Sequence, residues 1–450
     1  MTLSEAATAA LEWSSELSLA KDRIDQAAVN VARAWALVLP TWNASLSYTR
    51  RAPEPPTLTF PAFPDLGSAE VQAACRDPAD PSMLAPSEAC FVAVLDEFNS
   101  ARNAPGMSFD FARADTINLS SQVTWTVFNG RFFAAHASAE DGVELERARL
   151  EAGRTAVVVA VARSYYAALA TQRSKEVAER AAGRARAKLS VERARAGAGQ
   201  ESRSRLVAAE IHLREAELDV ERARNAHQRT LLALGFAAGL GPGFDVAPRG
   251  PIEVASGDEL RLVEAARASR PEVRAAARSL MIAERERDDF LWKLAPTLAL
   301  FGAFRASNVE GITGQKTEWT FGANANWVLF DAGLRYAERD EAEARLSSAR
   351  HSEEKLLRAI SNEIRAARLA LEGARISRAR AEVAVELARA TLDVAEQQHA
   401  AGTIREIDLR EAVDGVADTE LSVVRADFDR DLAALDLAAA LGTVDALLSD

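Results

Sequence analysis

The sequence predicts a mainly helical protein with a small β part, in which one structural plan is used twice. Two runs of about 65 residues, 132–196 and 335–400, are rich in Ala, Arg, Glu and Leu and contain no proline. Four shorter segments alternate apolar and polar residues, which is typical of strands with two different faces. The order of these segments repeats along the chain, and an internal repeat of this kind decides the fold class.

The first match between the repeats is a helix that leads into a strand. Residues 3–48 and 260–304 both read as an amphipathic helix followed by a β-like segment. A proline stands at the junction in each, Pro40 in the first copy and Pro296 in the second. Because a proline disfavours helical backbone at the residue before it, both helices should stop there.

The second match lies where each β segment leads into a long helix. Trp125 precedes Phe128 by three residues, and Trp327 precedes Phe330 by three. An acid or amide and a glycine follow in both copies. The third match is a glycine break late in each helical run, with a leucine seven residues beyond it: Gly199 to Leu206 and Gly402 to Leu409.

These matches divide the chain into parts. Repeat 1 has a helix at 1–39, a β-hairpin at 40–130 with a long Pro-rich loop at about 50–117, and a helical hairpin at 131–235 with its tip near 197–200. A Gly/Pro-rich linker follows at 236–258. Repeat 2 has a helix at 259–295, a β-hairpin at 296–332 and a helical hairpin at 333–442 with its tip near 400–403. A tail, 443–450, ends the chain.

Helix length predicts how these parts pack. A 65-residue helix is roughly 97 Å long, and the helix that returns from each tip covers only about half of it. The helices 1–39 and 259–295 have about the missing length. We therefore expect a tall helical layer in which two shorter helices stack end to end beside each long one.

The four alternating segments, 41–49, 119–127, 297–306 and 319–329, combine an apolar face with a small polar face. Aromatic residues gather on the apolar face: Trp42, Tyr48, Trp125, Trp319 and Trp327. Strands of an outer-membrane barrel need this pattern, with aromatics at the lipid interfaces, although a soluble β-sandwich would share it. Four strands cannot close a barrel, and lipid does not tolerate open strand edges. Membrane-spanning strands would thus require an oligomer that shares one barrel.

Composition excludes several functions. The net charge is −12 and no basic block occurs, which argues against a nucleic-acid partner. No nucleophile–base set, metal-ligand cluster or phosphate loop is present, so we expect no enzyme activity, no cofactor and no metal site. The only two cysteines, Cys75 and Cys90, fit either a disulfide within the Pro-rich loop or two free thiols.

Membrane-targeting signals are weak at the level of single segments. The longest apolar run, at 156–162, is far shorter than the ~18–20 residues of a spanning helix. No signal peptide is visible at the N-terminus. Bulk properties therefore leave open whether the chain is cytoplasmic or begins near a mature N-terminus.

The order of elements resembles the TolC-like outer-membrane efflux proteins, the exit ducts of tripartite pumps and type I secretion systems. The resemblance is carried by Leu39-Pro40, by Trp125-x-x-Phe128-Asn129-Gly130, by Phe330-Asp331-x-Gly333 and by the tip segment 400–412, and it covers about residues 3–442. Each motif is weak by itself, but their order, used twice, is specific.

The resemblance implies a homotrimer with a twelve-stranded outer-membrane barrel and a helical periplasmic tunnel. It also implies two kinds of partner, a periplasmic adaptor (membrane fusion) protein and an inner-membrane transporter of the RND, ABC or MFS class. The chain would be a passive conduit for small molecules or polypeptides. The alternative is a non-catalytic periplasmic coiled-coil scaffold or adaptor, in which the strands would form a local soluble sheet.

The resemblance further assigns roles to the tips. Gly199, Ala401, Gly402 and Thr403 would form the turns that dock the adaptor. Asp408 and Glu411 share a helix face, and a threefold axis would gather them into an acidic ring that favours cations at the pore constriction. Alternatively, Arg405 and Arg410 on the same helix neutralise an exposed acidic pair. The first repeat offers no acids there, since Arg205 and Ala208 hold the matching positions.

Overall fold

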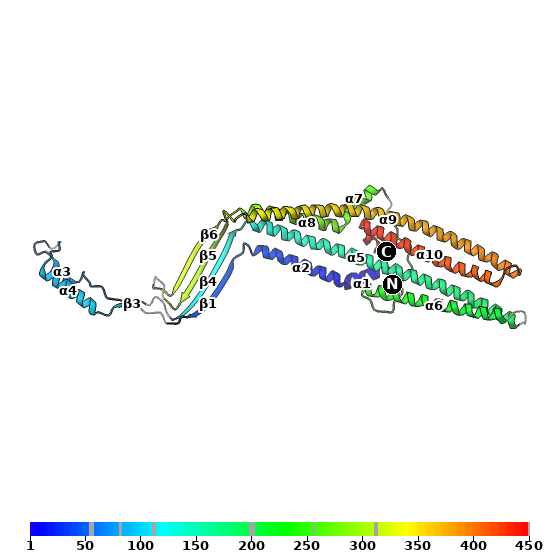
Figure 1. The fold of residues 1–450 in the computed structure, drawn as a ribbon, viewed down its shortest axis with the longest axis horizontal. Helices are drawn as coiled ribbons and strands as arrows, with labels where there is room; N and C mark the ends of the chain where they lie inside the picture. The colour runs from blue at the N-terminus through cyan, green and yellow to red at the C-terminus, as the bar shows by residue number, and fades with distance from the viewer. Residues whose placement is uncertain are drawn as a thin grey trace. The chain divides into compact units, whose positions relative to one another are not determined.

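The computed structural model describes residues 1–53, 58–80, 83–109, 114–197, 203–254, 257–309 and 314–448. The chain forms two compact units (Figure 1). The helical unit contains residues 1–35, 130–295 and 328–450, and the sheet unit contains 36–129 and 296–327. The predicted class, mainly helical with four antiparallel strands, is confirmed.

The helical unit consists of two long hairpins and several shorter helices. In chain order these are α1 (Leu3–Trp13), α2 (Ser15–Trp35), α5 (Arg131–Gly197), α6 (Arg203–Ala238), α7 (Glu259–Ser269), α8 (Pro271–Lys293), α9 (Leu334–Ala400), α10 (Glu406–Leu441) and the short 3₁₀ helix η1 (Val444–Leu447). The long helices α5 and α9 each have 67 residues. Each pairs with the 36-residue helix that follows it, α6 or α10.

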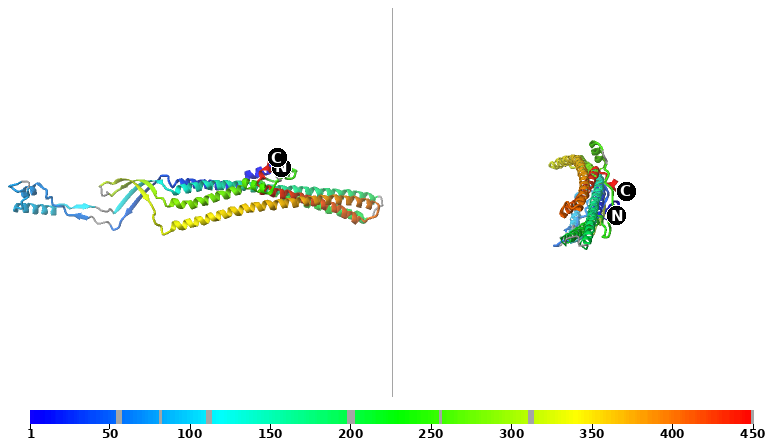
Figure 2. Two further views of the ribbon diagram at one scale, coloured as in Figure 1. Left: turned by 90° about the horizontal axis from the view of Figure 1, so that it is seen from above. Right: turned by 90° about the vertical axis from the view of Figure 1, so that its right-hand side faces the viewer.

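These helices form a single layer. At one end α2 packs on α5, α5 on α8 and α8 on α9. At the other end the order is α6, α5, α10 and α9. Seen end-on, the layer is curved rather than closed into a bundle (Figure 2). Two shorter helices therefore lie along each long one, α2 and α6 along α5 and α8 and α10 along α9, as the length argument predicted.

The helices expected to run unbroken over 3–39 and 259–295 are each interrupted, which corrects the sequence interpretation. Ser14 is extended, with ψ of 115°, and separates α1 from α2. Its amide closes α1 by donating to Ala10, and its hydroxyl accepts from the Leu17 amide in the first turn of α2. In the second repeat Pro271 begins α8, so Arg270 is extended and α7 ends.

The main core lies near the middle of the layer, where both chain termini also lie (Figure 1). Its largest fully buried side chains include Leu3 of α1, Tyr165 of α5, Leu234 of α6 and Leu435 of α10. The Tyr165 hydroxyl donates to the Ala247 carbonyl at 2.6 Å. The linker is thus fixed against α5, and the many alanines around this core let the helices approach closely.

The sheet unit holds one four-stranded antiparallel sheet in the order β1–β4–β5–β6. Its strands are β1 (Thr41–Arg50), β4 (Asp115–Phe128), β5 (Thr297–Ser307) and β6 (Thr317–Asn326). The two repeats meet at the β4–β5 pair, where Trp125 lies opposite Leu300. Within the described residues β1 and β6 each have a strand partner on one side only.

The loop predicted at about 50–117 is not simply extended Pro-rich chain. It contains a short ribbon of β2 (Leu58–Phe60) and β3 (Met107–Phe109), and two helices, α3 (Ala69–Cys75) and α4 (Glu88–Asn103). Ser68 caps α3 and Ser87 caps α4, each by accepting from a backbone amide three residues ahead. The serine caps, which the Pro-rich composition of the segment obscured, are the local signal for these helices.

A buried carboxylate joins α5 to α8. Asp141 is buried in α5, and its two oxygens accept from Arg278 and Arg285 of α8, both at 3.0 Å. Asp141→Ala removes both charge-assisted bonds and should lower stability by about 1–3 kcal/mol. The measurement is the midpoint of helix unfolding by circular dichroism at fixed protein concentration. Asp340→Ala, which removes an exposed acid of α9, is the matched control and should leave the midpoint unchanged. Equal midpoints for both variants would contradict this role.

Candidate functional site

The turn between α9 and α10 is built by three of the residues that the sequence singled out. Ala401 is the C-cap residue of α9, and Gly402 follows with a φ of +75°, a conformation that favours glycine. The Gly402 amide donates to the His399 carbonyl, and the Thr403 amide donates to the Gln398 carbonyl at 2.9 Å. The Thr403 hydroxyl donates to the same carbonyl at 2.8 Å. This is a Schellman turn, and it explains why the long helix reverses here.

Asp408 lies in the first turn of α10, and its carboxylate is hydrogen-bonded to Arg405. Its carboxylate accepts from the Arg405 amide at 3.0 Å and from the Arg405 guanidinium at 3.0 and 3.2 Å. The hydrogen bonds from the Arg405 side chain and amide hold the pKa of Asp408 below its ordinary value. Asp408 therefore stays ionised in more acidic solution than an ordinary aspartate, and its charge is partly compensated by Arg405.

Glu411 lies one turn beyond Asp408 and is exposed. No ion pair reaches it from any residue that the structure describes. Both acids line one hollow of about 860 Å³ between α9 and α10, together with apolar and small side chains such as Leu387 and Val394. The structure thus places the two predicted acids on one surface, with Glu411 uncompensated.

Arg410 does not neutralise Glu411, contrary to the alternative considered from the sequence. Its guanidinium pairs with Glu215 of α6 at 2.5 Å and with Asp414 at 3.6 Å. Other ion pairs also join α10 to the first hairpin near the tips. Lys188 of α5 pairs with Glu406, and Arg180 of α5 pairs with Glu420 at 3.6 Å. Sequence reasoning missed these links because their partners lie about 200 residues apart.

The first-repeat tip is described only on its two flanks, α5 up to Gly197 and α6 from Arg203. Gly199, the predicted turn residue there, lies outside the described residues. The described part resumes at Arg203, so Arg205 and Ala208 lie in the first two turns of α6. Any acidic ring from matching positions therefore comes from the second repeat alone.

The five aromatic residues predicted as lipid-facing anchors occupy the sheet unit. Pairing register puts Trp42, Tyr48, Trp125 and Trp319 on one face, and their side chains are between 49% and 75% exposed. The Trp42 indole donates to Ser121, the Trp125 indole to the Val38 carbonyl, and the Tyr48 hydroxyl to Asp115. Trp327 lies one residue beyond the end of β6 and is 60% exposed.

The opposite face of the sheet holds features that simple alternation did not reveal. Arg305 and Glu318 lie opposite each other in register on this mainly polar face. Phe301 lies over Gly322, where an added Cβ would come within 2.6 Å of the phenyl ring. The close fit explains the glycine. Phe301 interrupts the alternation in 297–306, and that irregularity was the available signal.

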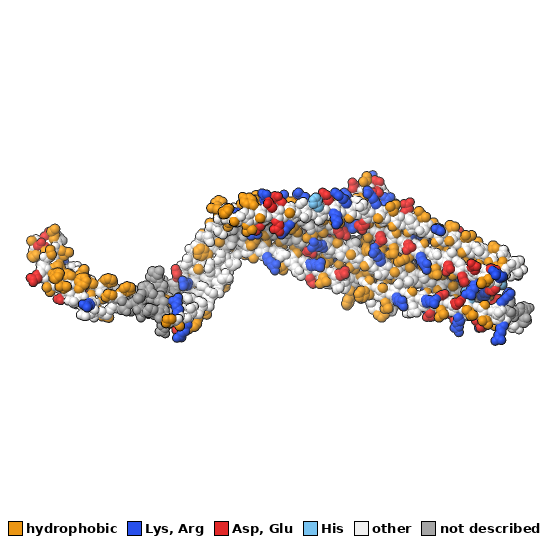
Figure 3. Space-filling model, in the orientation of Figure 1, with side chains coloured by type: hydrophobic (Ala, Val, Ile, Leu, Met, Phe, Trp, Pro, Cys, Tyr) orange, Lys and Arg blue, Asp and Glu red, His pale blue; other side chains and the backbone are white. Residues whose placement is uncertain are grey.

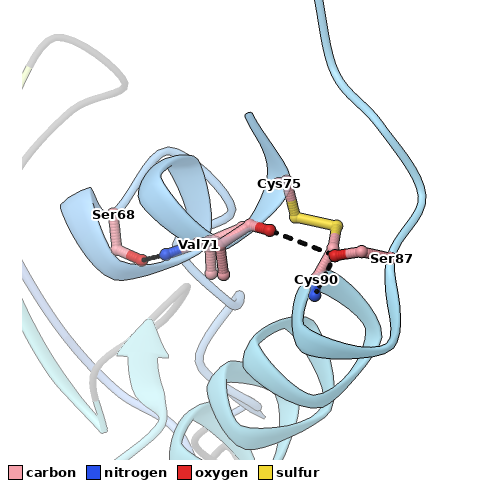
Figure 4. The surroundings of a disulfide bond; sticks show 6 residues. Ser68, Val71, Cys75, Ser87 and Cys90 are labelled. Atoms are coloured by element: carbon pink, nitrogen blue, oxygen red, sulfur yellow. Dashed lines mark hydrogen bonds between the residues drawn. A yellow bond between two sulfur atoms is a disulfide. The ribbon is translucent and has the colours of Figure 1, made fainter. Parts of the chain in front are cut away.

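Cys75, the last residue of α3, is joined by a disulfide to Cys90 in the first turn of α4 (Figure 4). Their Cα atoms are 4.5 Å apart. The Ser87 hydroxyl, which caps α4, also donates to the Ala74 carbonyl at 3.3 Å. The bond and the cap together fix the angle between two short helices.

Comparison with known families identifies the chain. A family model described as "Outer membrane efflux protein" matches residues 95–240 and 262–443. The chain belongs to the outer membrane efflux protein family. Its relatives are conduits rather than enzymes, and they lie in the outer membrane with a periplasmic tunnel, so the chain is placed there as well. No curated protein sequence matches the chain significantly.

Solved structures agree on the fold at low sequence identity. The Campylobacter jejuni CmeC outer membrane channel is 15% identical, with a TM-score of 0.70 over 98% of this chain and 85% of that one. Vibrio cholerae VceC is 17% identical, with a TM-score of 0.69 over 98% and 96%. The open state of Neisseria gonorrhoeae MtrE is 17% identical, with a TM-score of 0.71 over 98% and 88%. No helix among the described residues has the length and hydropathy needed to cross a membrane.

Proposed function

We propose that three copies of this chain form the exit duct of a tripartite efflux pump or type I secretion system. The duct is a passive conduit for small molecules or polypeptides that an inner-membrane transporter drives through it. The observation that carries the proposal is that, among the described residues, both units of the chain have open edges. In the part of the chain that the structure describes, the outer strands of the sheet and the outer helices of the curved layer each have a neighbour on one side only, as expected for a segment of a closed barrel or tunnel.

The sheet supplies the first open edges. The apolar face of the four strands is exposed, and β1 and β6 lack an outer partner within the described residues. Unpaired backbone groups are not tolerated in hydrocarbon, so strands that cross a membrane must close. Pairing β6 of one copy with β1 of the next, three times, gives twelve strands and a barrel wider than the eight-stranded kind that side chains fill.

The helical layer supplies the second pair of edges. On α9 the exposed apolar residues Leu369, Ile376 and Val383 recur every seven positions, which is the spacing of a coiled-coil seam. On α6, at the other edge, Ile211 and Leu218 are exposed at the same spacing. Packing α9 of one copy on α6 of the next buries both seams. Because the layer is four helices wide at each end, three copies make a twelve-helix tunnel.

Surface charge supports a water-filled tunnel with docking sites at its tip. Lys and Arg are interspersed with Asp and Glu along the helical unit, without a large patch of one sign on the visible face (Figure 3). The turn at Ala401, Gly402 and Thr403 joins α9 to α10 at one end of the second hairpin. The corresponding turn of the first repeat is expected at Gly199, which lies outside the described residues. A periplasmic adaptor would dock at these turns and connect the duct to a transporter of the RND, ABC or MFS class.

Assembly is tested by changing the α9 seam. Ile376→Glu places three unpaired carboxylates in the proposed α9–α6 interface, and we expect the detergent-solubilised protein to lose most of its trimer. Native mass spectrometry measures the number of chains in each particle. Ser377→Glu, the same change at an exposed neighbour about 100° around the helix, should leave the trimer intact. A monomeric wild-type protein would contradict the duct and favour a coiled-coil scaffold.

Selectivity is tested by neutralising the acids that line the hollow. Asp408→Asn with Glu411→Gln should shift the single-channel reversal potential in a salt gradient toward less cation preference, because six carboxylates would leave one constriction. The charge-matched control is Glu386→Gln with Glu396→Gln, on a part of α9 directed away from the hollow. Equal reversal potentials for the two double variants would show that Asp408 and Glu411 do not form the constriction.

Because the pKa of Asp408 is lowered, the cation preference measured by the reversal potential should depend on pH. An acid with a lowered pKa keeps its charge as the pH falls, until the pH approaches that lowered value. Arg405→Met should therefore make the cation preference decline at a higher pH than in the wild type. An unshifted pH profile would mean that Asp408 does not contribute to the preference.

A further inference from the structure

The segment between β1 and β4 forms a small folded module, which we call the insert and define as the described residues of 58–109. The β2–β3 ribbon holds its two ends together, and the Cys75–Cys90 disulfide joins its helices. The Asp65 amide donates to Glu97 of α4 at 3.2 Å, so the chain before α3 is fixed to α4 as well. The insert therefore presents α4 in a defined orientation within the module.

Helix α4 has two apolar faces. Cys90 and Val94 line a hollow with Val71 of α3, and Ala101 is buried. Phe91, Leu95 and Phe98 lie at spacings of four and three residues on another face, and they are 67%, 45% and 51% exposed. Residues at these spacings form one continuous stripe. Since α3 already covers the first face, the described residues leave this stripe, which we call the α4 stripe, without a partner.

Charge placement around the α4 stripe favours association with identical copies. Like charges beside the contact would repel when a helix packs on its own symmetry mates. The residues that flank the stripe, Val92 and Asn99 on one side and Val94 and Ala101 on the other, are all uncharged. Asp96 and Glu97 project more than 100° away from the stripe at about 100° per residue. Glu88 and Arg102 lie only at its two ends, where water can hydrate them.

We propose that three copies of α4 pack on one another through Phe91, Leu95 and Phe98, and so draw the three inserts together at one mouth of the shared barrel. The inference rests on the trimer proposed above. The partners of each α4 stripe are the α4 helices of the second and third copies. The three helices run in the same direction because a threefold rotation about the barrel axis preserves the sense of a helix along that axis.

The anchoring of the insert makes this contact reachable. Arg50 and Asp115 are paired neighbours at the ends of β1 and β4, so each insert leaves the sheet from one rim. Twelve strands about 4.8 Å apart and tilted by roughly 40° give a barrel radius of roughly 12 Å. The chain from Phe109 to Asp115 can span at most ~20 Å. The barrel axis therefore lies within reach of each insert, because the barrel radius of roughly 12 Å is shorter than the ~20 Å that the connecting chain can span.

Attachment to one rim also compensates for the shortness of the α4 stripe. Two helical turns of apolar contact are too few for stable association of free helices in water. Three inserts anchored to one barrel face each other at an effective concentration of millimolar order or higher. Each insert then needs only weak mutual affinity, which three stacked layers of Phe, Leu and Phe can supply.

Cysteine cross-linking tests the contact in the full-length protein. Cys75 and Cys90 are bonded to each other, so a new cysteine supplies the only free thiol. Leu95→Cys puts this thiol at the centre of the α4 stripe. Ser100→Cys puts it on the same helix, exposed and about 140° around. Both proteins are treated with a mild oxidant in detergent and analysed on denaturing, non-reducing gels, with native mass measured on the same samples.

We expect Leu95→Cys to give a covalent dimer at least tenfold more abundant than Ser100→Cys gives. At most two thirds of the chains can be linked, because three thiols around an axis form one pair. Equal or negligible cross-linking in a sample that is trimeric by native mass would overturn the α4 contact while leaving the duct intact. A monomeric native mass would overturn the duct and the α4 contact together.

Discussion

Backbone hydrogen bonding at the edges of the four-stranded sheet is the constraint on which the other features depend. Each chain supplies only β1, β4, β5 and β6, and the outer two have one partner each in the described residues. In lipid those edges must be paired, and the family to which the chain belongs lies in the outer membrane. Threefold sharing of one barrel satisfies the edges without adding any strand to the chain.

Threefold assembly also explains why the helical unit is an open, curved layer. Its curved layer is four helices wide at both ends because α1–α2 and α7–α8 supply the length that α6 and α10 lack. The sheet has two edge strands, β1 in repeat 1 and β6 in repeat 2. The helical layer likewise has two exposed heptad seams, one on α6 in repeat 1 and one on α9 in repeat 2. The interruptions at Ser14 and Pro271 occur in the shorter helices, while α5 and α9 run unbroken for 67 residues each and set the length of the unit.

Much of this architecture was predictable from the sequence because the chain contains two repeats with the same order of helices and strands. Period-two alternation located all four strands of the sheet, and the glycine break at Gly402 located the turn between α9 and α10. The Schellman turn at Gly402 follows from one glycine between two helical runs. Contacts between distant segments were not predictable: pairs such as Glu215 with Arg410 depend on packing that no local pattern encodes. The helices of the insert were missed because prolines around them dominated the composition, although Ser68 and Ser87 stand at their starts.

Pairing between β1 of one copy and β6 of the next is the contact that would close the shared barrel, and an intermolecular disulfide scan measures it most directly. Ser45→Cys at the middle of β1 is combined, one at a time, with cysteines at positions 319–325 of β6, and oxidised membranes are run on denaturing gels. Cross-strand neighbours bring their Cβ atoms within reach of a disulfide. If β1 and β6 pair between copies, covalent trimers form at β6 positions two residues apart, which lie on one face of the strand. Absence of intermolecular bonds across the whole scan would contradict this pairing.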